Sequence, residues 1–494
     1  MSKTSKILSV FRFLTISLTV SLVLLPIWLY QNFGITVLSD NMLFHVLMGT
    51  DALIGVDHQI IRLLINELVL LPLGIALIFE FTLLILKFKL SETKKRKYQN
   101  FYNYIGLLDK KSILFGIVLI AAIDSSCSLG ATQYFYQQTA SKDYFSAYYT
   151  KPGLVLKRSV KKKNLIILYV ESLEQNLTNR EIFGTNIIEP IDKLPGITIK
   201  KFAAAPGTGC TIAGIVSSQC AIPLRAAPFI KDLKLINFFL PKATCIGDIL
   251  ASQGYDQYLF IGSDLRFTRV DKFYQNHGYK HLYGKREFAS SGTSPSLFRG
   301  WGNGLNDDTL LDEAFNHIIK AAKSNKPFNA VIMTTDSHPP KGTPSPRCSQ
   351  PERDNGLIGT YQCTSRFVAA FIEKLQNRGI LDNTTLILMG DHPLISPPEY
   401  FKYFPNPRYV YFKIFDPNFK KKPTRDTMTH FDVAPTILDL LNIQLSTHKQ
   451  FGLGVSIFAN SSQVDYKKLF DAVTKQSILN PSKTYDSLWR PTNH

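Results

Sequence analysis

The sequence is short of acidic residues: 38 Asp and Glu stand against 56 Lys and Arg, which leaves a formal net charge of +18 over 494 residues. A balance this basic is typical of proteins that bind nucleic acid or an anionic membrane surface. No nucleic-acid-binding motif accompanies the charge, and the Gly-Lys-Ser/Thr signature of a P-loop is absent. The sequence also contains no internal repeat and no long low-complexity tract, so a repeat array is excluded.

Long apolar runs in the N-terminal third account for much of this composition. Each of three runs is close to the ~20 apolar residues that a bilayer core requires. They are Phe13–Tyr30, Leu68–Leu86 and Ser112–Ala131. The first lacks a small-residue cleavage site, so we expect an uncleaved anchor. Residues 1–135 are therefore predicted to form a transmembrane region of about three helices, in which Glu80 is either a helix-packing partner or a functional group.

The distribution of basic residues predicts the orientation of these helices. Basic residues cluster before the first run and between the second and third, at Lys3, Lys6, Arg12, Lys89, Lys94, Lys95, Arg96, Lys97, Lys110 and Lys111. Such clusters stay in the cytoplasm, so Ser39–Ile61 and everything after the third run are expected outside. We therefore expect a multi-pass inner-membrane protein with a periplasmic domain and no nucleic-acid partner.

A juxtamembrane linker, residues 136–163, is expected to follow the third run. Its basic stretch Lys157–Lys163 fits either contact with anionic lipid or an ordinary solvated linker. Five of the six cysteines lie beyond this point, where an oxidising compartment permits disulfides. Cys348 with Cys363 and Cys220 with Cys245 are plausible pairs, although spacing alone does not fix the connectivity.

The chain from about Asn164 alternates short apolar runs with amphipathic helical patterns, which indicates an α/β domain with a mostly parallel central sheet. The expected strands are Asn164–Val170, Gln257–Gly262, Asn329–Thr335, Thr384–Gly390 and Tyr409–Phe415, and the expected helices include Thr309–Lys323 and Arg366–Gly379. We assign residues 164–460 to this domain and residues 461–494 to a polar C-terminal tail.

Chemically useful side chains follow four of these strands. They are Glu171, then Asp264 and Arg266, then Asp336 and His338, then Asp391 and His392. Because the carboxyl ends of parallel strands share one edge of a sheet, ligands bind there. Polar residues follow strands in most proteins, but four such endings together predict a site.

Three of these residues, Glu171, Asp391 and His392, form a plausible metal-binding set. Two oxygens and one imidazole nitrogen suit Zn or Mn better than Ca, which prefers oxygen alone. Three protein ligands also leave an open position, as a catalytic site requires. Taken singly, the Asp-His pair also fits a turn with an exposed histidine, and Glu171 fits a capping or surface acid.

The stretch PGTGCTIAG, Pro206–Gly214, supplies hydroxyl groups where a helix is expected to begin. Thr211 stands at the predicted helix start, where it fits either a metal-activated nucleophile or an ordinary N-cap. Thr208 is expected to be a turn residue, and no role is assigned to Cys210.

Three further residues are candidates for contact with a substrate. His338 is placed to donate a proton to a leaving alkoxide or to bind a phosphoryl oxygen. Arg266 fits a bidentate phosphate contact or a structural salt bridge. Trp301 fits a pocket wall or plain core packing.

Five motifs in this order resemble those of membrane enzymes of the sulfatase and alkaline-phosphatase-like superfamily: LYVESLEQ, APGTGCTIAGIVSSQCAIPL, TTDSHPP, MGDHPL and HFDVAPTILDLL. That group includes lipoteichoic acid synthases, phosphoethanolamine transferases and the phosphoglycerol transferases that act on periplasmic glucans, and the resemblance is strongest to the last. A true sulfatase nucleophile requires Cys-x-Pro/Ala-x-Arg, whereas Thr-Ile-Ala-Gly follows Cys210 here.

The resemblance implies an alkaline-phosphatase-like fold and a mechanism. Thr211 would be the nucleophile and a ligand of one divalent ion, Mn or Zn with Mg as an alternative, held also by Glu171, Asp391 and His392. His338 would contact the transferred phosphate. Phosphatidylglycerol would be the donor and a glycan hydroxyl the acceptor, with phosphoethanolamine transfer to lipopolysaccharide as the alternative. The glucan enzymes carry a long further C-terminal region, which leaves the acceptor open.

Overall fold

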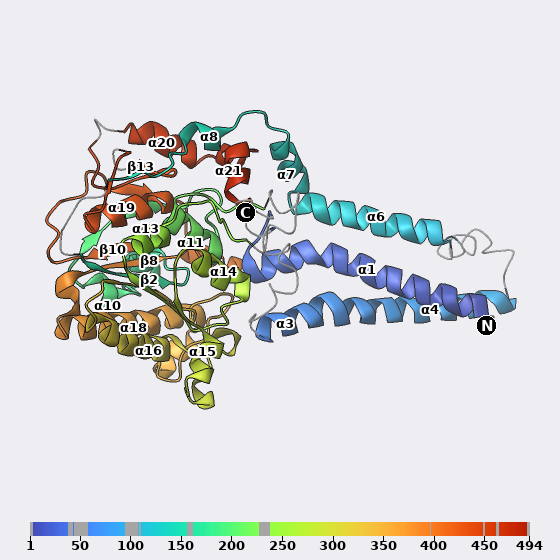
Figure 1. Ribbon diagram of the computed structural model, residues 1–494. Coiled ribbons are helices and arrows are strands. Elements are labelled where there is room, and N and C mark those ends of the chain that lie inside the picture. The colour runs from blue at the N-terminus through green and yellow to red at the C-terminus, as the bar shows by residue number, and fades with distance from the viewer. Residues whose placement is uncertain are drawn as a thin grey trace. The chain divides into compact units, whose positions relative to one another are not determined.

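The structure is a computed structural model that describes residues 3–37, 43, 58–93, 107, 110–155, 162–226, 238–395, 397–447, 450–460 and 464–491. Internal packing divides the described residues into two compact units: the first lies within residues 1–38 and 57–136, and the second takes Leu43 together with the residues from Gln137 onward (Figure 1). The first five residues of the basic stretch Lys157–Lys163 lie outside the described residues, as do all of Lys94–Lys97 and most of Ser39–Ile61.

The N-terminal unit is built from long apolar helices. They are α1 (Lys3–Phe33), α3 (His58–Ile65) continuing through the π-helical turn η2 (Asn66–Leu70) into α4 (Leu71–Thr93), and α6 (Lys111–Ser128). Within the described residues, three helical segments are long and apolar enough to cross a membrane, namely Ile7–Phe33, His58–Leu86 and Lys111–Ser128. They coincide with the three apolar runs of the sequence, and helix α1 packs against both α4 and α6.

A buried ion pair joins α1 to α4. Arg12 Nε lies 2.5 Å from Glu80 Oε1, and Arg12 Nη2 lies 2.6 Å from Glu80 Oε2. Ser9 Oγ donates a further hydrogen bond of 2.8 Å to the same carboxylate. The bidentate geometry satisfies both charges within the apolar unit. Of the two interpretations of Glu80, the structure shows the helix-packing partner.

The second unit is organised around a seven-stranded sheet with the order β3-β10-β8-β2-β7-β5-β6 (Figure 1). The strands are β3 (Ile197–Thr198), β10 (Phe412–Phe415), β8 (Thr384–Gly390), β2 (Asn164–Val170), β7 (Phe328–Met333), β5 (Asp256–Ile261) and β6 (His281–Tyr283). Strands β8, β2, β7, β5 and β6 run parallel, and β10 is antiparallel to both of its neighbours. The predicted α/β class with a mostly parallel sheet is confirmed.

Helices cover both faces of this sheet, which explains why its central strands are apolar without alternation. One face carries α11 (Thr211–Cys220), α13 (Ile246–Ser252) and α19 (Val433–Leu440) (Figure 1). The other carries α10 (Glu189–Asp192), α16 (Asp307–Ala322) and α18 (Gly356–Asn377). The central strands β8 and β7 are buried along their whole length.

Two elements differ from the sequence prediction. The run Tyr409–Phe415 was expected to be one strand, but it breaks at Tyr411 into β9 (Tyr409–Val410) and the antiparallel β10. Strand β9 joins a separate sheet with β4 (Lys201–Ala203) and β11 (Thr427–Thr429). The sequence does not predict this break, because apolar content indicates that a segment is buried but not which strand it pairs with.

Helix α18 begins at Gly356, well before the predicted start at Arg366. A Cβ on its Gly359 would lie 1.9 Å from the Glu352 carbonyl oxygen, so close packing requires the glycine. The first half of α18 is rich in small and polar residues, so the sequence pattern there is typical of a loop.

The C-terminal segment predicted to be a polar tail packs into the domain over its described residues. It contains α20 (Tyr466–Val473), η11 (Gln476–Leu479) and α21 (Lys483–Leu488). The Tyr485 ring lies 5.2 Å from that of Phe145 in α8 (Tyr144–Tyr148), and the Trp489 ring lies 5.2 Å from that of Phe239. Both C-terminal aromatic side chains are fully buried.

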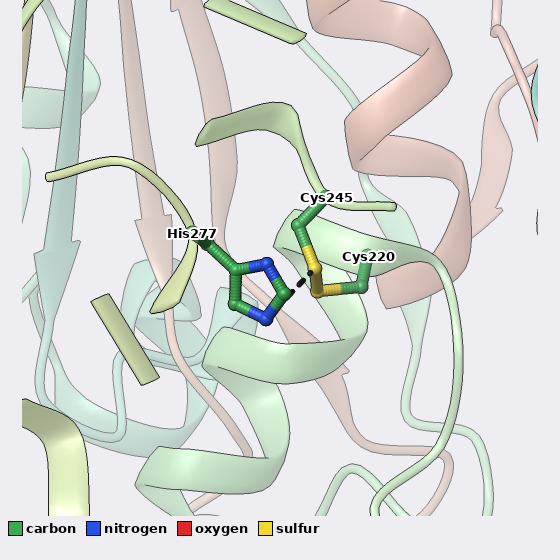
Figure 2. A group of neighbouring side chains, drawn as sticks. All are labelled: Cys220, Cys245 and His277. Carbon is green, nitrogen blue, oxygen red and sulfur yellow. Dashed lines mark hydrogen bonds between the residues drawn. A yellow bond between two sulfur atoms is a disulfide. The ribbon is translucent and has the colours of Figure 1, made fainter. Parts of the chain in front are cut away.

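Both predicted disulfides are present, Cys220–Cys245 and Cys348–Cys363. The first ties the end of α11 to the residue that precedes α13 (Figure 2). His277 Nε2 lies 3.6 Å from Cys245 Sγ, and His277 Nδ1 lies 2.8 Å from Asp248 Oδ2. Cys127 and Cys210 remain free.

We predict that Trp489→Ala lowers the free energy of unfolding by about 3–5 kcal/mol, because it leaves a large cavity in the core. The neighbouring Arg490 is exposed, so Arg490→Ala serves as the matched control with little expected change. Thermal unfolding of the full chain in detergent measures both. Equal stability of the two variants would show that the C-terminal segment contributes nothing to the core.

Candidate active site and metal centre

Neighbouring parallel strands deliver the first site residues to the same edge of the sheet. Strands β2 and β8 are paired with Val170 opposite Gly390. The next residue along β2 is Glu171, and the next two along β8 are Asp391 and His392. In-register pairing therefore brings both carboxylates and the imidazole out side by side, as the strand endings predict.

Thr211, the first residue of α11, completes this group. Its Oγ1 lies 3.3 Å from Glu171 Oε2 and 3.4 Å from His392 Nε2. His392 Nε2 in turn lies 3.6 Å from Glu171 Oε1 and 3.4 Å from Asp391 Oδ2. The structure thus brings together all four predicted metal-site residues, of which only Thr211 is more than marginally exposed.

Close approach of α11 to the end of β8 depends on Gly214. A Cβ at this position would lie 2.0 Å from the carbonyl oxygen of Asp391, which no side chain tolerates. Because Gly214 is one helical turn after Thr211, it allows the start of the helix to reach the carboxylates. No pattern in the sequence marks this glycine as part of the site.

The donor set fits a divalent metal ion. Asp391 Oδ1 accepts hydrogen bonds from the backbone N–H groups of Ser172 (2.7 Å) and His392 (3.0 Å). Its other oxygen, Oδ2, is buried and has no hydrogen-bond partner among the described residues. His392 Nδ1 lies 2.8 Å from the Pro393 carbonyl, which holds the proton there and leaves the Nε2 lone pair for a ligand bond.

The electrostatics of the site also favour a cation. Burial and the Glu171 carboxylate raise the pKa of Asp391 to about 6. Burial by itself lowers the pKa of His392, but Asp391 and Glu171 outweigh it and raise that pKa overall. The buried site therefore holds two carboxylates without enough positive charge to balance them, and a divalent ion would supply that charge.

Supporting residues around the ligands were not assigned a role from the sequence. His430 Nε2 lies 2.7 Å from the Asp391 carbonyl, and burial lowers the pKa of His430 to about 3, so the ring stays neutral. Tyr361 donates a hydrogen bond of 2.9 Å to the Ser172 carbonyl. Glu174 accepts from the Leu394 N–H at 2.8 Å and pairs with Arg408. The motifs LYVESLEQ and HFDVAPTILDLL contain Glu174 and His430, but their partners are distant in sequence.

His338 and Trp301 lie together. His338 follows β7, which neighbours β2, and its ring is 4.4 Å from that of Trp301. His338 Nδ1 lies 2.8 Å from the Pro339 carbonyl, while Trp301 is buried and also packs on Phe267. His338 is half-buried and follows the end of β7, at the same edge of the sheet as Glu171.

Two carboxylates predicted at this edge serve other purposes. Asp264 binds Arg266 through hydrogen bonds of 2.8 and 3.0 Å and also binds Arg286. Of the two interpretations of Arg266, the structure shows the salt bridge. Asp336 accepts from the backbone N–H of Asp307 at 3.0 Å, which caps helix α16.

Cys210 precedes α11 with its thiol buried. Burial raises the pKa of this thiol to about 12, so it stays protonated and is a poor nucleophile. The structure therefore offers Thr211, and not Cys210, as the reactive group at the start of the helix.

The sulfatase family model matches residues 163–443, which is more than half of the chain and contains all the site residues described above. The chain therefore belongs to the sulfatase family.

Phosphoglycerol transferase I of Escherichia coli is 31% identical over 367 residues, which are 70% of this chain and 46% of the relative. The protein of the same name from Shigella flexneri is 31% identical over 365 residues, with the same shares. The chain thus spans about half the length of these relatives. Among solved structures, the lipoteichoic acid synthase LtaP from Listeria monocytogenes matches with a TM-score of 0.52 and 21% identity, covering 68% of this chain and 96% of LtaP, which supports the fold.

We predict that the double variant Asp391→Ala/His392→Ala loses its bound metal, because it removes two of the three strong ligands. Metal analysis after dialysis against Zn or Mn should give about one ion per wild-type chain and almost none in the variant. Asp264→Ala, which removes a nearby carboxylate held by arginines, should retain the ion. Equal metal content in wild type and double variant would refute the site.

We also predict a pH-dependent stability effect at Asp307. Burial raises the pKa of this carboxyl to about 6, against about 3.9 in an unfolded chain. The folded state therefore holds an extra proton between these values, and its stability falls as pH rises from about 4 to about 6. Asp307→Asn escapes this loss, so its advantage over wild type should grow across that window to about 1–3 kcal/mol.

The substitution preserves the local hydrogen bonds. The amide oxygen can accept from Thr335 and Asp336 N–H, and the amide nitrogen can donate to Thr364 Oγ1. Asp312→Asn is the control of opposite sign: despite partial burial, hydrogen bonds from Lys374 and Arg347 lower the pKa of Asp312. Thermal unfolding across the pH range measures both, and a pH-independent difference for Asp307→Asn would contradict the prediction.

Proposed function

We propose that the protein is a membrane-anchored transferase that moves a phosphoglycerol group from phosphatidylglycerol to a glycan hydroxyl through a covalent intermediate on Thr211. The observation that carries this proposal is the position of Thr211 Oγ1 between Glu171 and His392 at the start of α11. A hydroxyl there lies beside the ligand set at the N-terminus of a helix, and both features favour a phosphoryl group. The similarity to phosphoglycerol transferases supports the choice of headgroup.

The residues of this chain divide the work of the first step. Thr211 Oγ1 forms a bond to the donor phosphorus, and the bond from phosphorus to the diacylglycerol oxygen breaks. Glu171, Asp391 and His392 would hold an ion of Zn, Mn or Mg, which would lower the pKa of the Thr211 hydroxyl and offset negative charge on the phosphate. The proton lost from Thr211 must end on the diacylglycerol oxygen, and His338 is the candidate to accept it at Nε2 and pass it on, because its Nδ1 is held by the Pro339 carbonyl and its ring lies against Trp301.

A lipid donor accounts for the apolar helices of the N-terminal unit. Three candidate spans anchor the chain in the bilayer that contains the donor. Basic residues flanking the spans support an inner-membrane, multi-pass topology with the catalytic unit in the periplasm. Two disulfides in that unit fit an oxidising compartment.

We predict that incubation with phosphatidylglycerol adds a glycerophosphoryl group to the peptide containing Thr211, detectable by mass spectrometry. Thr211→Ala should abolish the adduct and lower the rate of diacylglycerol release by at least about a thousandfold, because it removes the oxygen that forms the bond to phosphorus. An adduct of phosphoethanolamine mass, formed with phosphatidylethanolamine alone, would favour the alternative donor.

Thr208 provides a matched control in the same loop. Its hydroxyl donates to the Ala205 carbonyl at 2.7 Å and is fully buried. Thr208→Ala should therefore keep the adduct, at some cost in stability. Full activity in Thr211→Ala, with no adduct from any phospholipid, would disprove the covalent mechanism.

A further inference from the structure

A hollow of about 250 Å³ lies beside the loop that carries His338. Its floor is polar and buried, formed by Asn306, Asp308 and Ser345. Its rim is exposed and includes Leu297, Arg299 and Arg347. The mechanism described above uses none of these residues.

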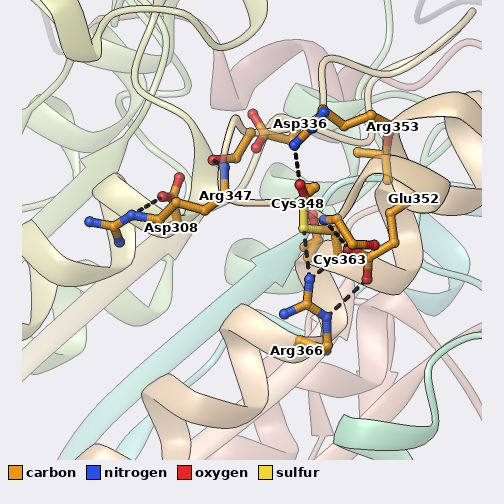
Figure 3. Close-up of a disulfide and its surroundings, with 12 residues drawn as sticks. Asp308, Asp336, Arg347, Cys348, Glu352, Arg353, Cys363 and Arg366 are labelled. Atoms are coloured by element: carbon orange, nitrogen blue, oxygen red, sulfur yellow. Dashed lines mark hydrogen bonds and ion pairs between the residues drawn. A yellow bond between two sulfur atoms is a disulfide. The ribbon is translucent and has the colours of Figure 1, made fainter.

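The floor contains a carboxylate that is only half satisfied. Asp308 Oδ2 pairs with Arg347 Nε at 3.1 Å (Figure 3). Asp308 is only 6% exposed, and its other oxygen, Oδ1, has no hydrogen-bond partner within the part of the chain that the structure describes. A buried acceptor without a donor is costly, so a ligand that supplies a donor would be stabilised here.

The wall that bears Arg347 is held in place by covalent and ionic links. Arg347 directly precedes Cys348, whose disulfide to Cys363 ties this loop to α18 (Figure 3). Arg347 Nη1 also pairs with Asp312 Oδ2 at 3.1 Å. The arginine is thus pre-positioned at the rim, which reduces the entropic cost of binding.

Asn306 connects the hollow to the loop that carries His338. Asn306 Nδ2 donates hydrogen bonds to Asp336 Oδ1 (3.0 Å) and to the Thr343 carbonyl (3.1 Å). Asp336 lies two residues before His338, and Arg299 lies two residues before Trp301, the partner of His338. The hollow is therefore lined by the segment that leads to Trp301 and by the loop that carries His338.

We propose that this hollow is the acceptor subsite and binds a neutral sugar unit. A sugar hydroxyl can donate to Asp308 while an adjacent hydroxyl accepts from Arg347 or Arg299, and Leu297 offers an apolar surface to the ring. The unpartnered Asp308 oxygen requires a hydrogen-bond donor, which a sugar hydroxyl supplies and a fully ionised phosphate does not. The inference rests on the proposed function and assigns the second half of its reaction.

In that second step the sugar hydroxyl oxygen forms a bond to phosphorus. The bond from phosphorus to Thr211 Oγ1 breaks, and the hydroxyl proton returns to Thr211. Water competes for the same intermediate and releases free glycerol phosphate. The ratio of transfer to hydrolysis therefore reports on acceptor binding independently of how fast the intermediate forms.

The test uses the full chain in detergent with phosphatidylglycerol as donor and a glucose tetrasaccharide as the acceptor probe. Arg299→Ala, Arg347→Ala and Asp308→Asn should each lower the transfer-to-hydrolysis ratio about tenfold, the loss expected for one hydrogen bond to a charged group. Arg378→Ala, which removes an exposed arginine at the end of α18, should leave the ratio unchanged.

A wild-type ratio in all three variants would overturn the subsite. An equal fall in transfer and in hydrolysis would also overturn it and would assign the hollow to the donor headgroup. Saturation-transfer NMR, which detects binding of the tetrasaccharide to wild type and to Arg347→Ala, provides a second measurement. If the wild type cleaves no donor, the proposed function fails, and NMR still decides the hollow: sugar signals lost in Arg347→Ala support it, and identical signals refute it.

Discussion

The contact between Gly214 of α11 and the Asp391 carbonyl is the constraint on which the site depends. It permits the start of a helix from one layer to meet the ends of β2 and β8 in the sheet. Disulfide Cys220–Cys245 fixes the other end of the same helix. The nucleophile candidate is thus held at both ends of its own element, which gives the positional accuracy that phosphoryl transfer requires.

The groups around the carboxylates of Glu171 and Asp391 are either neutral or paired with one another. His430 stays neutral beneath Asp391, and Glu174 has its own partner in Arg408. The excess negative charge therefore remains on Glu171 and Asp391, where a cation can use it. Such an arrangement positions the ligands in advance at the expense of local stability.

Much of the site follows from the sequence because strand ends in a parallel sheet converge. The rule locates Glu171, Asp391 and His392 without any knowledge of packing, and the small-residue start of α11 adds Thr211. The rule fails for Asp264 and Asp336, since a side chain at the right edge can still be claimed by Arg266 or by a helix terminus. It also cannot find Glu174, whose importance arises from Arg408, more than two hundred residues away.

Fold prediction fails for a related reason at Tyr411, where one apolar run serves two sheets. Apolar content records that a segment is buried, whereas pairing depends on neighbours distant in the chain. The hollow beside Arg347 also cannot be predicted from the sequence, because its floor and rim come from three separate segments.

A covalent intermediate explains why such a hollow is useful: donor and acceptor need not be bound together. A bilayer lipid and a water-soluble sugar can then use different surfaces of one protein in turn, joined only by the phosphorus atom on Thr211.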